Sequence, residues 1–532
     1  MSGRTKSVLA VLLFTGLLIR LLGVHWGLPS KSLTLASYHP DEAFVFQSLE
    51  NIQKTRSLNP GWIGLHYGTF HFYLSGVLLL AAKVLGLISL GSRDWMLANL
   101  GEADKMYLVI RYFSVFCGVL AVYAVFLLGR KVADTSVGLW AAFFTAFSPI
   151  LIEISYFAKL DALLPALVAF LLLVSMDYLE RPSRKNLWLC GILAGLLAST
   201  RYNCGVMLLV PVYALWQNRR GDFLKKTAVL ASAALIAFIL TTPYALLDIG
   251  TFIKGLDHMW NLFSSGSPRQ ESRLMGIGQI LFTFFPFAAG WPATLLFFLS
   301  VALVLIRKMT LQEKMLALSF ASFFVLVSFS GIRFTYYIIP LMPAFAVFLG
   351  LGLKTLSERL PRPAAVVLAS LLILAQAGYS WAYSNLYSGV NTREAADAWI
   401  TKNIPQGETI GMLRSYFWTP GLLRQKSPPY RMVKGGDDDS SLSDALSNLS
   451  RTKDLPAYFL LSDMETNILN GFSGTDLSIP QDLAVFLSRY ERVAAFEREP
   501  EIFGVAVWKR TAPFDLRRAN PALWLYKLKD RK

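Results

Sequence analysis

Long apolar runs dominate the first 385 residues of this 532-residue chain. Several contain roughly 18 or more residues, which is long enough to cross the hydrocarbon core of a bilayer. Only 16% of the residues are charged, against about 25% in soluble domains. The chain is therefore predicted to be a multi-span membrane protein. This composition excludes a soluble enzyme, a disordered chain, a collagen-like fibre and a disulfide scaffold.

Loop charges predict how the chain crosses the membrane. We predict apolar segments at 8–26, 69–90, 107–128, 136–152, 160–179, 187–200, 202–217, 226–247, 279–306, 314–331, 335–353 and 364–383. Loops rich in Lys and Arg are expected in the cytoplasm; they are those at 130–131, 180–185, 218–226, 307–314 and 354–362. The opposite ends, near 159–161, 200–203, 248–275 and 331–334, are then external.

The first span and the number of crossings follow from the same argument. Arg20 interrupts the first apolar run and no small-residue cleavage site follows it, so we predict an uncleaved span with a cytoplasmic N-terminus. A cytoplasmic N-terminus and an external C-terminal segment require an odd number of crossings. We therefore expect a broken or doubled span around Lys83–Leu100, which gives about thirteen crossings in all.

The chain divides into a membrane module and a soluble domain. Residues 1–385 form the membrane module, whose first external loop at 28–68 is expected to carry juxtamembrane helices. Residues 390–512 have the composition of a soluble α/β domain, with a helix, a turn and a strand over 393–413 and further strands at 455–463 and 503–510. Residues 513–532 form a basic, aromatic tail of a kind that suits a membrane surface.

Two neighbouring acids follow the first span. Pro40 suits the first position of a helix, and Asp41 and Glu42 in the first turn favour its dipole. The same acids, preceded by His39 at the membrane edge, can instead serve as a general base beside a lipid-borne substrate. Local sequence leaves both interpretations open.

Several further charges stand at predicted span ends. Lys159 and Asp161 precede an apolar run, and they are either interfacial anchors or site residues. Arg111 lies inside an apolar stretch and needs a partner or an aqueous cavity. Arg201 and Arg333 face outward, against the usual charge bias.

These outward cations have two interpretations. Together they could hold a phosphate or pyrophosphate group, with Tyr336 and Tyr337 beside Arg333. Each one alone could instead extend to lipid headgroups. Arg20 could extend in the same way or reach the same cavity.

Metal and nucleotide motifs are weak. His39, His66 and His71 lie in or just after the first external loop, but their spacing matches no zinc signature. Cys117, Cys190 and Cys204 are interpreted as small buried hydrophobic residues. The sequence contains no Walker loop, GxGxxG, HExxH or CxxC motif. No cofactor is required by these patterns, and a divalent cation is left open.

Seven motifs follow one another along the chain: YHPDEAF at 38–44, YGTFHFYL at 67–74, VIRYFSV at 109–115, SPILIEISYFAKLD at 148–161, GILAGLLASTRYN at 191–203, TTPYALLD at 241–248 and RFTYYIIPLMPAFAVFLGLGL at 333–353. In this order they resemble the GT-C membrane glycosyltransferases, nearest to bacterial relatives of the dolichyl-phosphate-mannose protein mannosyltransferases, a group that includes the lipid A aminoarabinose transferase.

The resemblance implies a fold, a location and a reaction. The fold is an all-α polytopic bundle of about 12–13 transmembrane helices with a small C-terminal α/β extracytoplasmic domain. The location is the bacterial inner membrane, with the active site and the C-terminal domain on the periplasmic side. The reaction is inverting transfer of a hexosyl or pentosyl group from a polyprenyl-phosphate donor to lipid A or lipopolysaccharide, a protein or another glycan.

The resemblance also implies roles for single residues. Asp41 is the expected catalytic base with Glu42 beside it, and Asp161, Arg111 and Arg201 match further family positions. Lys159, Arg333, Tyr336, Tyr337 and His39 are expected to bind the lipid phosphate or substrate. The lipid A enzyme has a Lys-Pro pair before its second span, where this chain has Tyr67-Gly68-Thr69, so that enzyme's metal and phosphate contacts are not carried over.

Three other functions are considered. A polytopic transporter or lipid flippase fits the number of spans but not the large external loop and domain. An O-antigen ligase or polymerase would share external arginines but lack the early Asp-Glu pair. A scaffold for envelope assembly would leave the charges at the membrane edge without a role.

Overall fold

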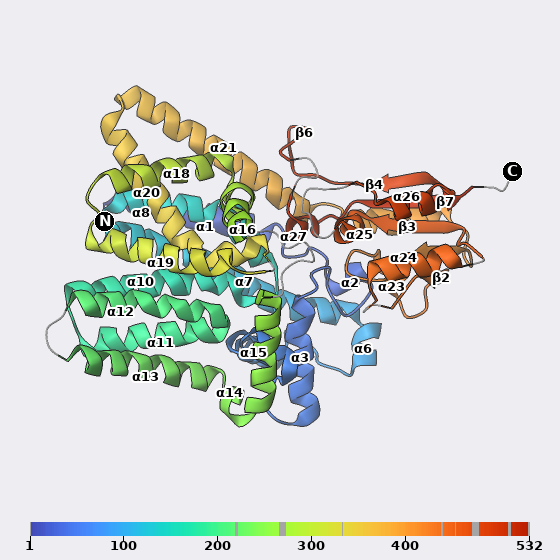
Figure 1. The fold of residues 1–532 in the computed structure, drawn as a ribbon, viewed down its shortest axis with the longest axis horizontal. Helices are drawn as coiled ribbons and strands as arrows, with labels where there is room; N and C mark the ends of the chain where they lie inside the picture. The colour runs from blue at the N-terminus through green and yellow to red at the C-terminus, as the bar shows by residue number, and fades with distance from the viewer. Residues whose placement is uncertain are drawn as a thin grey trace.

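The computed structural model describes residues 2–218, 222–264, 273–331, 333–437, 440–452, 454–470, 478–508 and 512–529. Parts of the loops predicted at 218–226, 248–275 and 331–334, and the end of the predicted tail, lie outside the described residues. A large helical module comes first, and a smaller domain containing the strands follows it (Figure 1).

The helical module is built from helices that succeed one another along the chain. They are α1 (Gly3–Leu21), α2 (Pro29–Ser32), α3 (Glu42–Thr55), α4 (Gly61–Tyr67), α5 (Phe70–Val84), α6 (Arg93–Ala98), α7 (Leu100–Val132), α8 (Thr135–Ala146), α9 (Pro149–Glu153), η1 (Ile154–Tyr156), η2 (Leu160–Leu163), α10 (Leu164–Glu180), α11 (Arg184–Thr200), η3 (Tyr202–Leu208), α12 (Leu209–Gln217), α13 (Phe223–Thr241), α14 (Tyr244–Leu247), α15 (Ile249–Ser264), α16 (Arg273–Gln279), η4 (Ile280–Phe284), α17 (Phe285–Ala289), α18 (Trp291–Ile306), α19 (Leu311–Ser328), η5 (Thr335–Leu341), α20 (Met342–Arg359) and α21 (Arg362–Ser388).

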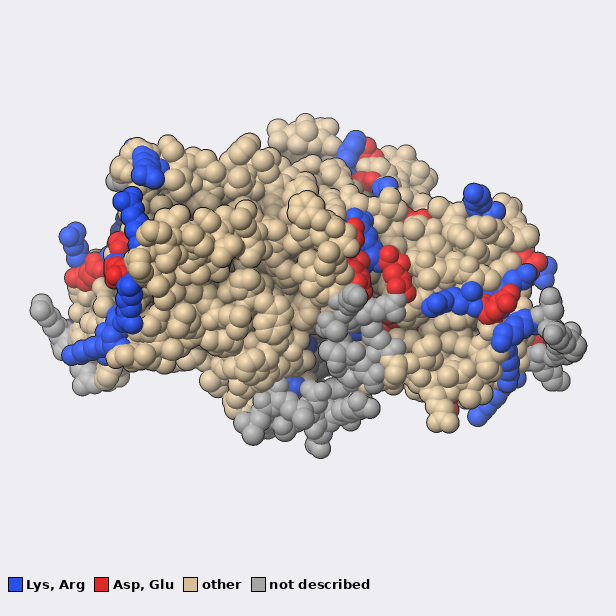
Figure 2. Space-filling view, turned by 90° about the horizontal axis from the view of Figure 1, so that it is seen from above, with Lys and Arg blue, Asp and Glu red and all other residues tan. Residues whose placement is uncertain are grey.

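The helical module is a membrane bundle. Among the described residues, six helical segments are long and apolar enough to cross a bilayer, or eight if each of two bent helix pairs makes one span. On the face seen in Figure 2, a wide area of this part carries no charged residues, and charges gather at its far end and at the boundary with the smaller domain. The uncharged belt is the surface that faces the lipid.

The break in the early spans lies elsewhere than expected. The prediction of a broken or doubled span around Lys83–Leu100 is wrong, because α6 has only six residues, about 9 Å of helix. The bend is instead at Gly68, where α4 and α5 meet at 120°. Gly68 has a φ of 110°, and a Cβ there would lie 2.6 Å from the carbonyl oxygen of Ser199, so only glycine fits.

A second predicted span is also divided. The apolar run 279–306 predicts one crossing, but Gly290 divides it into two short helices: the π-helical turn η4 continued by α17, and then α18. Gly290 has a φ of 92°, and Pro292 follows at the second position of α18. Apolar composition alone does not reveal such a break, because both halves are hydrophobic.

The smaller domain is a mixed sheet with helices. Its elements are α22 (Thr392–Asn403), β1 (Thr409–Met412), α23 (Gly421–Arg424), β2 (Arg431–Lys434), α24 (Leu442–Arg451), β3 (Tyr458–Ser462), α25 (Asp463–Leu469), α26 (Gln481–Leu487), β4 (Tyr490–Phe496), β5 (Glu501–Ile502), β6 (Val505–Ala506), α27 (Phe514–Arg517) and β7 (Leu523–Leu528). Five strands pair in the order β2-β1-β3-β7-β4, with β1 parallel to β2 and β3 and with β7 antiparallel to both its neighbours. The predicted helix, turn and strand at 393–413 are confirmed as α22 and β1.

The predicted basic tail is part of this domain. Residues 523–528 form β7, which lies between β3 and β4. Leu523 and Leu525 pack in one hydrophobic cluster, whereas Trp524 and Tyr526 pack in another. Both faces of the strand are therefore buried, and the aromatic side chains that suggest a membrane surface belong to a core.

Candidate active site

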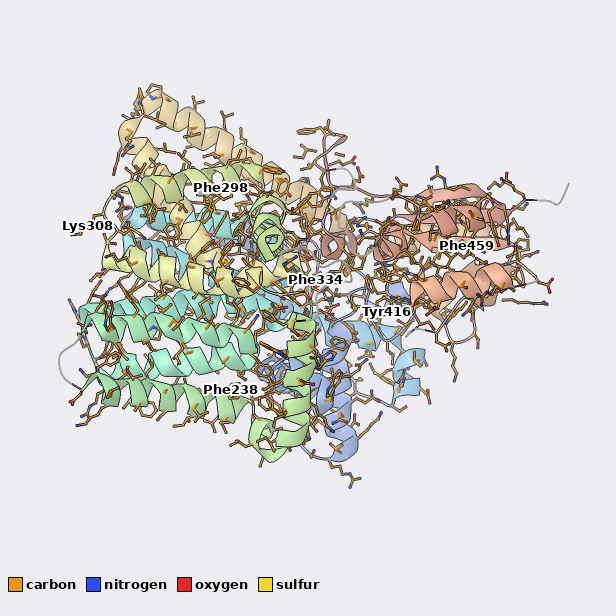
Figure 3. The ribbon with its side chains drawn as sticks, in the orientation of Figure 1. Phe238, Phe298, Lys308, Phe334, Tyr416 and Phe459 are labelled. Atoms are coloured by element: carbon orange, nitrogen blue, oxygen red, sulfur yellow. The ribbon has the colours of Figure 1, made fainter. Side chains whose placement is uncertain are left out.

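The predicted site residues come from loops and short helices at one end of the bundle. Asp41 precedes α3, Lys159 precedes η2, and Arg201 ends α11. Tyr336 lies in η5, next to Phe334, which Figure 3 places at the junction with the C-terminal domain, whereas Lys308 lies at the opposite end of the bundle. Irregular backbone breaks the helices here, and this frees the side chains to converge.

Four charged side chains form a continuous chain. The Lys159 ammonium lies 2.8 Å from a carboxylate oxygen of Asp41 and 3.2 Å from one of Asp161, and Arg201 Nε lies 3.2 Å from the other oxygen of Asp161. Each of these side chains keeps between 12% and 16% of its surface exposed. They are partly desolvated but still reachable.

An aromatic ring supports the two cations. The Lys159 ammonium lies 5.0 Å and the Arg201 guanidinium carbon 5.2 Å from the centre of the Tyr336 ring. Tyr337 adds a second ring, 5.7 Å from Arg201. These distances are within the range of cation–π attraction. The tyrosines predicted beside Arg333 therefore accompany Arg201 and Lys159 instead.

A cavity opens beside this charge chain. It is small and open to solvent, with about 320 Å³ of empty space when the adjoining solvent is included, and it is lined by Tyr67, His71, Lys159, Asp161, Thr200 and Arg201. Two cations, a phenol, a hydroxyl and an imidazole thus face one space, together with the Asp161 carboxylate that pairs with both cations. Such a set of donors matches a phosphate group better than it matches an apolar ligand.

Glu42 and Arg111 form a separate, dry pair. Arg111 Nε and Nη2 donate to the two oxygens of Glu42 at 2.9 and 2.7 Å. The Glu42 carboxylate also accepts from the Ser37 hydroxyl and the Ala158 N–H, while Arg111 Nη1 donates to backbone carbonyls of 24 and 26. Neither side chain is exposed. This pair fixes the loop around Asp41 to α7 and leaves no oxygen of Glu42 for a substrate.

His39 belongs to the loop that carries Asp41, and its buried imidazole is neutral. Its Nδ1 accepts from the Asp41 N–H at 3.1 Å, and its ring packs 4.2 Å from that of Phe157. Burial, helped by the positive charges of Arg518, Lys159 and Arg111, lowers the pKa of His39 well below its usual value. The side chain thus positions Asp41 through the backbone.

Arg333 and the remaining basic candidates lie elsewhere. Arg333 donates to Gln279 at 2.9 Å and to the carbonyl of Ser330 at 3.2 Å, apart from the residues that line the cavity. Arg20 is buried and donates to three backbone carbonyls at the ends of α1 and α8. The structure thus brings Lys159 and Arg201 together at the cavity, whereas Arg20 and Arg333 are not among the residues that line it.

The three histidines do not form a metal site. His66 packs against Trp62 and His258, while His71 lines the cavity. Within the described ranges, no three His, Cys, Asp or Glu side chains are grouped so as to hold a metal ion. The carboxylates of Asp41 and Asp161 are already paired with Lys159, so the residues present do not fit a divalent cation in this arrangement.

Sequence reasoning misses the contribution of the C-terminal domain. Arg518 lies 5.6 Å from the centre of the Tyr336 ring and pairs with Glu153 at 3.4 Å. Burial opposes the charge on Arg518, but the carboxylates of Glu153, Asp515 and Asp41 raise its pKa above the usual value. The one signal in the sequence is Glu153, an acid directly after the predicted apolar segment 136–152 and the last residue of α9.

The same segment fastens the two parts of the molecule together. Asp515 accepts from the N–H and hydroxyl of Thr335 at 2.8 and 3.1 Å, at the start of η5. The carbonyl of Ala519 accepts from the Trp26 indole at 3.2 Å and from Asn391 at 2.6 Å. Residues 515–520 therefore contact the end of the first span, η5 and the start of the C-terminal domain at once.

Comparison with known proteins agrees with this architecture. The family model described as dolichyl-phosphate-mannose-protein mannosyltransferase matches residues 95–246, which include Arg111, Lys159, Asp161 and Arg201. The crystal structure of ArnT from Cupriavidus metallidurans bound to undecaprenyl phosphate is 15% identical, with a TM-score of 0.53 over 99% of this chain and 98% of that chain. The fold is that of the GT-C membrane glycosyltransferases.

An archaeal structure with this GT-C fold is similar to the same extent. The oligosaccharyltransferase AglB of Archaeoglobus fulgidus, in complex with an inhibitory peptide and a dolichol-phosphate, is 14% identical, with a TM-score of 0.51 over 95% of this chain and 75% of that chain. No curated protein sequence matches the chain. The predicted GT-C bundle with a small C-terminal domain is confirmed, whereas the roles of single residues stay predictions.

Proposed function

We propose that this chain is an inverting glycosyltransferase that moves a sugar from a polyprenyl-phosphate donor to a hydroxyl group of an acceptor, with Asp41 as general base. The GT-C fold and the match to the mannosyltransferase family support the reaction class. The observation that carries the assignment of the base is the charge chain from Asp41 to Arg201 beside the cavity. The acceptor is a lipid, a glycan or a protein.

The donor phosphate binds between Lys159 and Arg201. Before binding, the four side chains of the charge chain carry two positive and two negative charges and neutralise one another. A phosphate entering the cavity attracts the Lys159 ammonium away from Asp41. Asp41 then becomes a freer proton acceptor at the moment when the donor is in place.

The transfer of the sugar needs only the donor, the acceptor hydroxyl and these residues. The acceptor oxygen forms a bond to the anomeric carbon as the bond from that carbon to the phosphate oxygen breaks. The hydroxyl proton passes to Asp41, and the electron pair leaves with the polyprenyl phosphate. Attack from the face opposite the phosphate inverts the anomeric configuration.

Two physical effects account for the rate. A positioned general base contributes roughly 10²–10⁴-fold. Charge grows on the departing phosphate, where a preorganised cation in a partly dry site is comparable to an oxyanion-hole donor, about 2.7–4 kcal/mol. The lipid-facing belt of the bundle lets the polyprenyl chain remain in the bilayer while its phosphate reaches the cavity (Figure 2).

The location is part of the proposal. Loops rich in Lys and Arg gather at the end of the bundle opposite the site, which favours the cytoplasm for that end. The cavity and the C-terminal domain then face the periplasm of a bacterial inner membrane. A donor with a single lipid phosphate suits that compartment, because the reaction needs no nucleotide.

The test begins with the product and then changes Asp41. Mass spectrometry of lipids and envelope glycans from cells with and without the gene identifies the sugar and the acceptor. Purified Asp41→Asn protein should then transfer that sugar about 10²–10⁴-fold more slowly than wild type. Its thermal unfolding midpoint in detergent should change only a little, because the amide keeps the shape of the side chain and Lys159 keeps Asp161 as a partner.

A surface carboxylate supplies the control. Glu50 lies on α3, the helix that follows Asp41, and pairs with Lys54 on the surface at 2.7 Å. Glu50→Gln should leave turnover near the wild-type value, since exposed pairs contribute about 0–1 kcal/mol. Near-normal turnover by Asp41→Asn would reject the base. Unchanged glycans together with altered substrate movement across the membrane would favour a transporter instead.

A further inference from the structure

A short hairpin of the C-terminal domain presents apolar side chains to the outside. β5 and β6 pair through Glu501 with Ala506 and Ile502 with Val505. The two residues between them, Phe503 and Gly504, have φ values of 51° and 78°, the left-handed conformation that tight hairpin turns require. Phe503 is fully exposed and Val505 is 70% exposed. An aromatic residue therefore occupies a strained position without a packing partner on the protein.

The hairpin runs along α21 toward the membrane belt. At its base, the Arg498 guanidinium donates to the carbonyls of Val390 and Asn385 at 2.9 and 2.8 Å. Farther along, Ile502 Cδ1 would lie 3.4 Å from a Cβ placed on Gly378. Gly378 and Asn385 lie about 10 Å apart along the axis of α21, at 1.5 Å per residue, and Gly378 is the one nearer the middle of the helix. In Figure 1, β6 lies beside α21 at the boundary between the bundle and the C-terminal domain.

The chain that follows β6 also packs against α21. Trp508 packs against Tyr383 at 5.4 Å and Tyr379 at 6.0 Å between ring centres. It also contacts Phe287 of α17 at 4.9 Å. The segment 498–508 is thus attached to membrane helices on both sides of its tip, so the direction of the tip is fixed.

The face of α21 beside the tip is exposed and apolar. Leu371, Leu374 and Trp381 each expose between 59% and 69% of their surface. A span of about 20 residues counted from Arg362 ends close to Trp381, and tryptophan is enriched at that boundary. Gly378 lies inside this limit. The hairpin tip therefore stands at the level where the hydrocarbon of the bilayer begins.

We propose that the β5–β6 hairpin is a membrane anchor, whose Phe503 and Val505 side chains insert into the lipid leaflet on the side of the C-terminal domain. The occupant is lipid because the tip continues the exposed apolar face of α21, which already contacts the bilayer. Glu499 and Glu501, together with Arg498, lie at the base and remain among the headgroups. The anchor holds the C-terminal domain against the bundle independently of sugar transfer.

Spin labels test this depth directly. Phe503→Cys and Val505→Cys proteins are labelled with a nitroxide and reconstituted in nanodiscs of phosphatidylcholine. Val485→Cys is the matched control, because Val485 is 60% exposed on α26, away from the bundle in Figure 1. The three native cysteines are buried, and the protein without an added cysteine gives their labelling background.

Power saturation then compares two relaxing agents. Labels at 503 and 505 should collide several-fold more with oxygen, which partitions into lipid, than with the water-soluble nickel chelate NiEDDA. The label at 485 should show the reverse. Equal access of NiEDDA at 503, 505 and 485 would overturn the proposal. Labels shielded from both agents would also overturn it, because they would indicate a protein partner or a second copy.

Discussion

Asp41 and Glu42 are neighbours in the sequence but occupy different environments. Asp41 keeps 16% of its side chain exposed and shares the Lys159 ammonium with Asp161, and both Lys159 and Asp161 line the cavity. Glu42 is fully buried, and its two oxygens receive four donors. An acid that can change partners suits proton transfer, whereas a fully satisfied acid suits structure.

The contrast shows how the chain separates two tasks. Arg111 is committed to Glu42 and to backbone carbonyls, so its charge holds the first external loop to α7. Lys159 and Arg201 are committed to acids at the cavity and to the Tyr336 ring, where a ligand can reach them. The Glu42–Arg111 pair therefore holds the loop in place, whereas the ion pairs of Lys159 and Arg201 lie where a substrate can bind.

Breaking the buried pair should have the largest effect on folding. Glu42→Gln leaves Arg111 charged and without its partner, which costs about 3–5 kcal/mol for a buried pair. The thermal unfolding midpoint in detergent should fall sharply, in contrast to Asp41→Asn. The double variant Glu42→Gln with Arg111→Met should lose less than the sum of the single changes. An unchanged midpoint for Glu42→Gln would contradict the division of tasks.

Acidic pH should lower the stability of the protein through His39, and this effect should be smaller than that of Glu42→Gln. His39 is buried neutral and its pKa is well below the usual 6.5. As the pH falls below about 6.5, the unfolded chain binds a proton that the folded chain does not, so stability falls by at most about 1.4 kcal/mol per pH unit. Thermal midpoints measured between pH 7 and 5 should decline.

Asparagine can replace this imidazole as a hydrogen-bond acceptor. His39→Asn keeps an acceptor near Nδ1 for the Asp41 N–H and removes the titration, so its midpoint should vary less with pH than that of wild type. His25, which is exposed, provides the control, and His25→Asn should keep the wild-type slope. Equal slopes in all three proteins would show that the buried imidazole does not account for the decline.

The smallest effect is expected at Arg333. The sequence predicts that this arginine binds the lipid phosphate, but it lies with Gln279 and Ser330. Arg333→Gln weakens charge-assisted hydrogen bonds, each worth about 1.5–3 kcal/mol of stability, but it changes no residue that lines the cavity. Sugar transfer should stay within a few-fold of wild type. A loss as large as that of Asp41→Asn would place Arg333 in the donor site after all.

The membrane class and several site residues are predictable from the sequence for physical reasons. Charges are rare within and beside membrane spans because a charge in the bilayer core is costly, so Lys159, Asp161 and Arg201 stand out against their apolar surroundings. The strands around Tyr458 and Thr409 are equally visible, because they follow local patterns of apolar residues. Local patterns do not report partners, and this is why the sequence shows that Arg111 needs a partner but does not identify it as Glu42.

The elements that escape prediction depend on distant contacts. Arg518 stands in a short polar loop before β7, and only the folded chain brings it to Tyr336, about 180 residues earlier. In the sequence, the six residues of β7 look like part of the basic, aromatic tail, because apolar and aromatic residues follow one another without a polar residue at every second position. In the structure, the strand pairs with β3 and β4. A strand buried on both faces lacks the alternation that marks a half-exposed strand.

The position of β7 in its sheet also has a consequence for biosynthesis. Among the paired strands of this sheet, β7 is the one translated after all the others, yet it separates β3 from β4. A chain that ends before residue 523 leaves β3 and β4 without the strand that joins them, so both present unpaired edges. Such truncated chains should attract chaperones or proteases, and the end of the bundle that carries the charge chain would lack the cover that this domain provides.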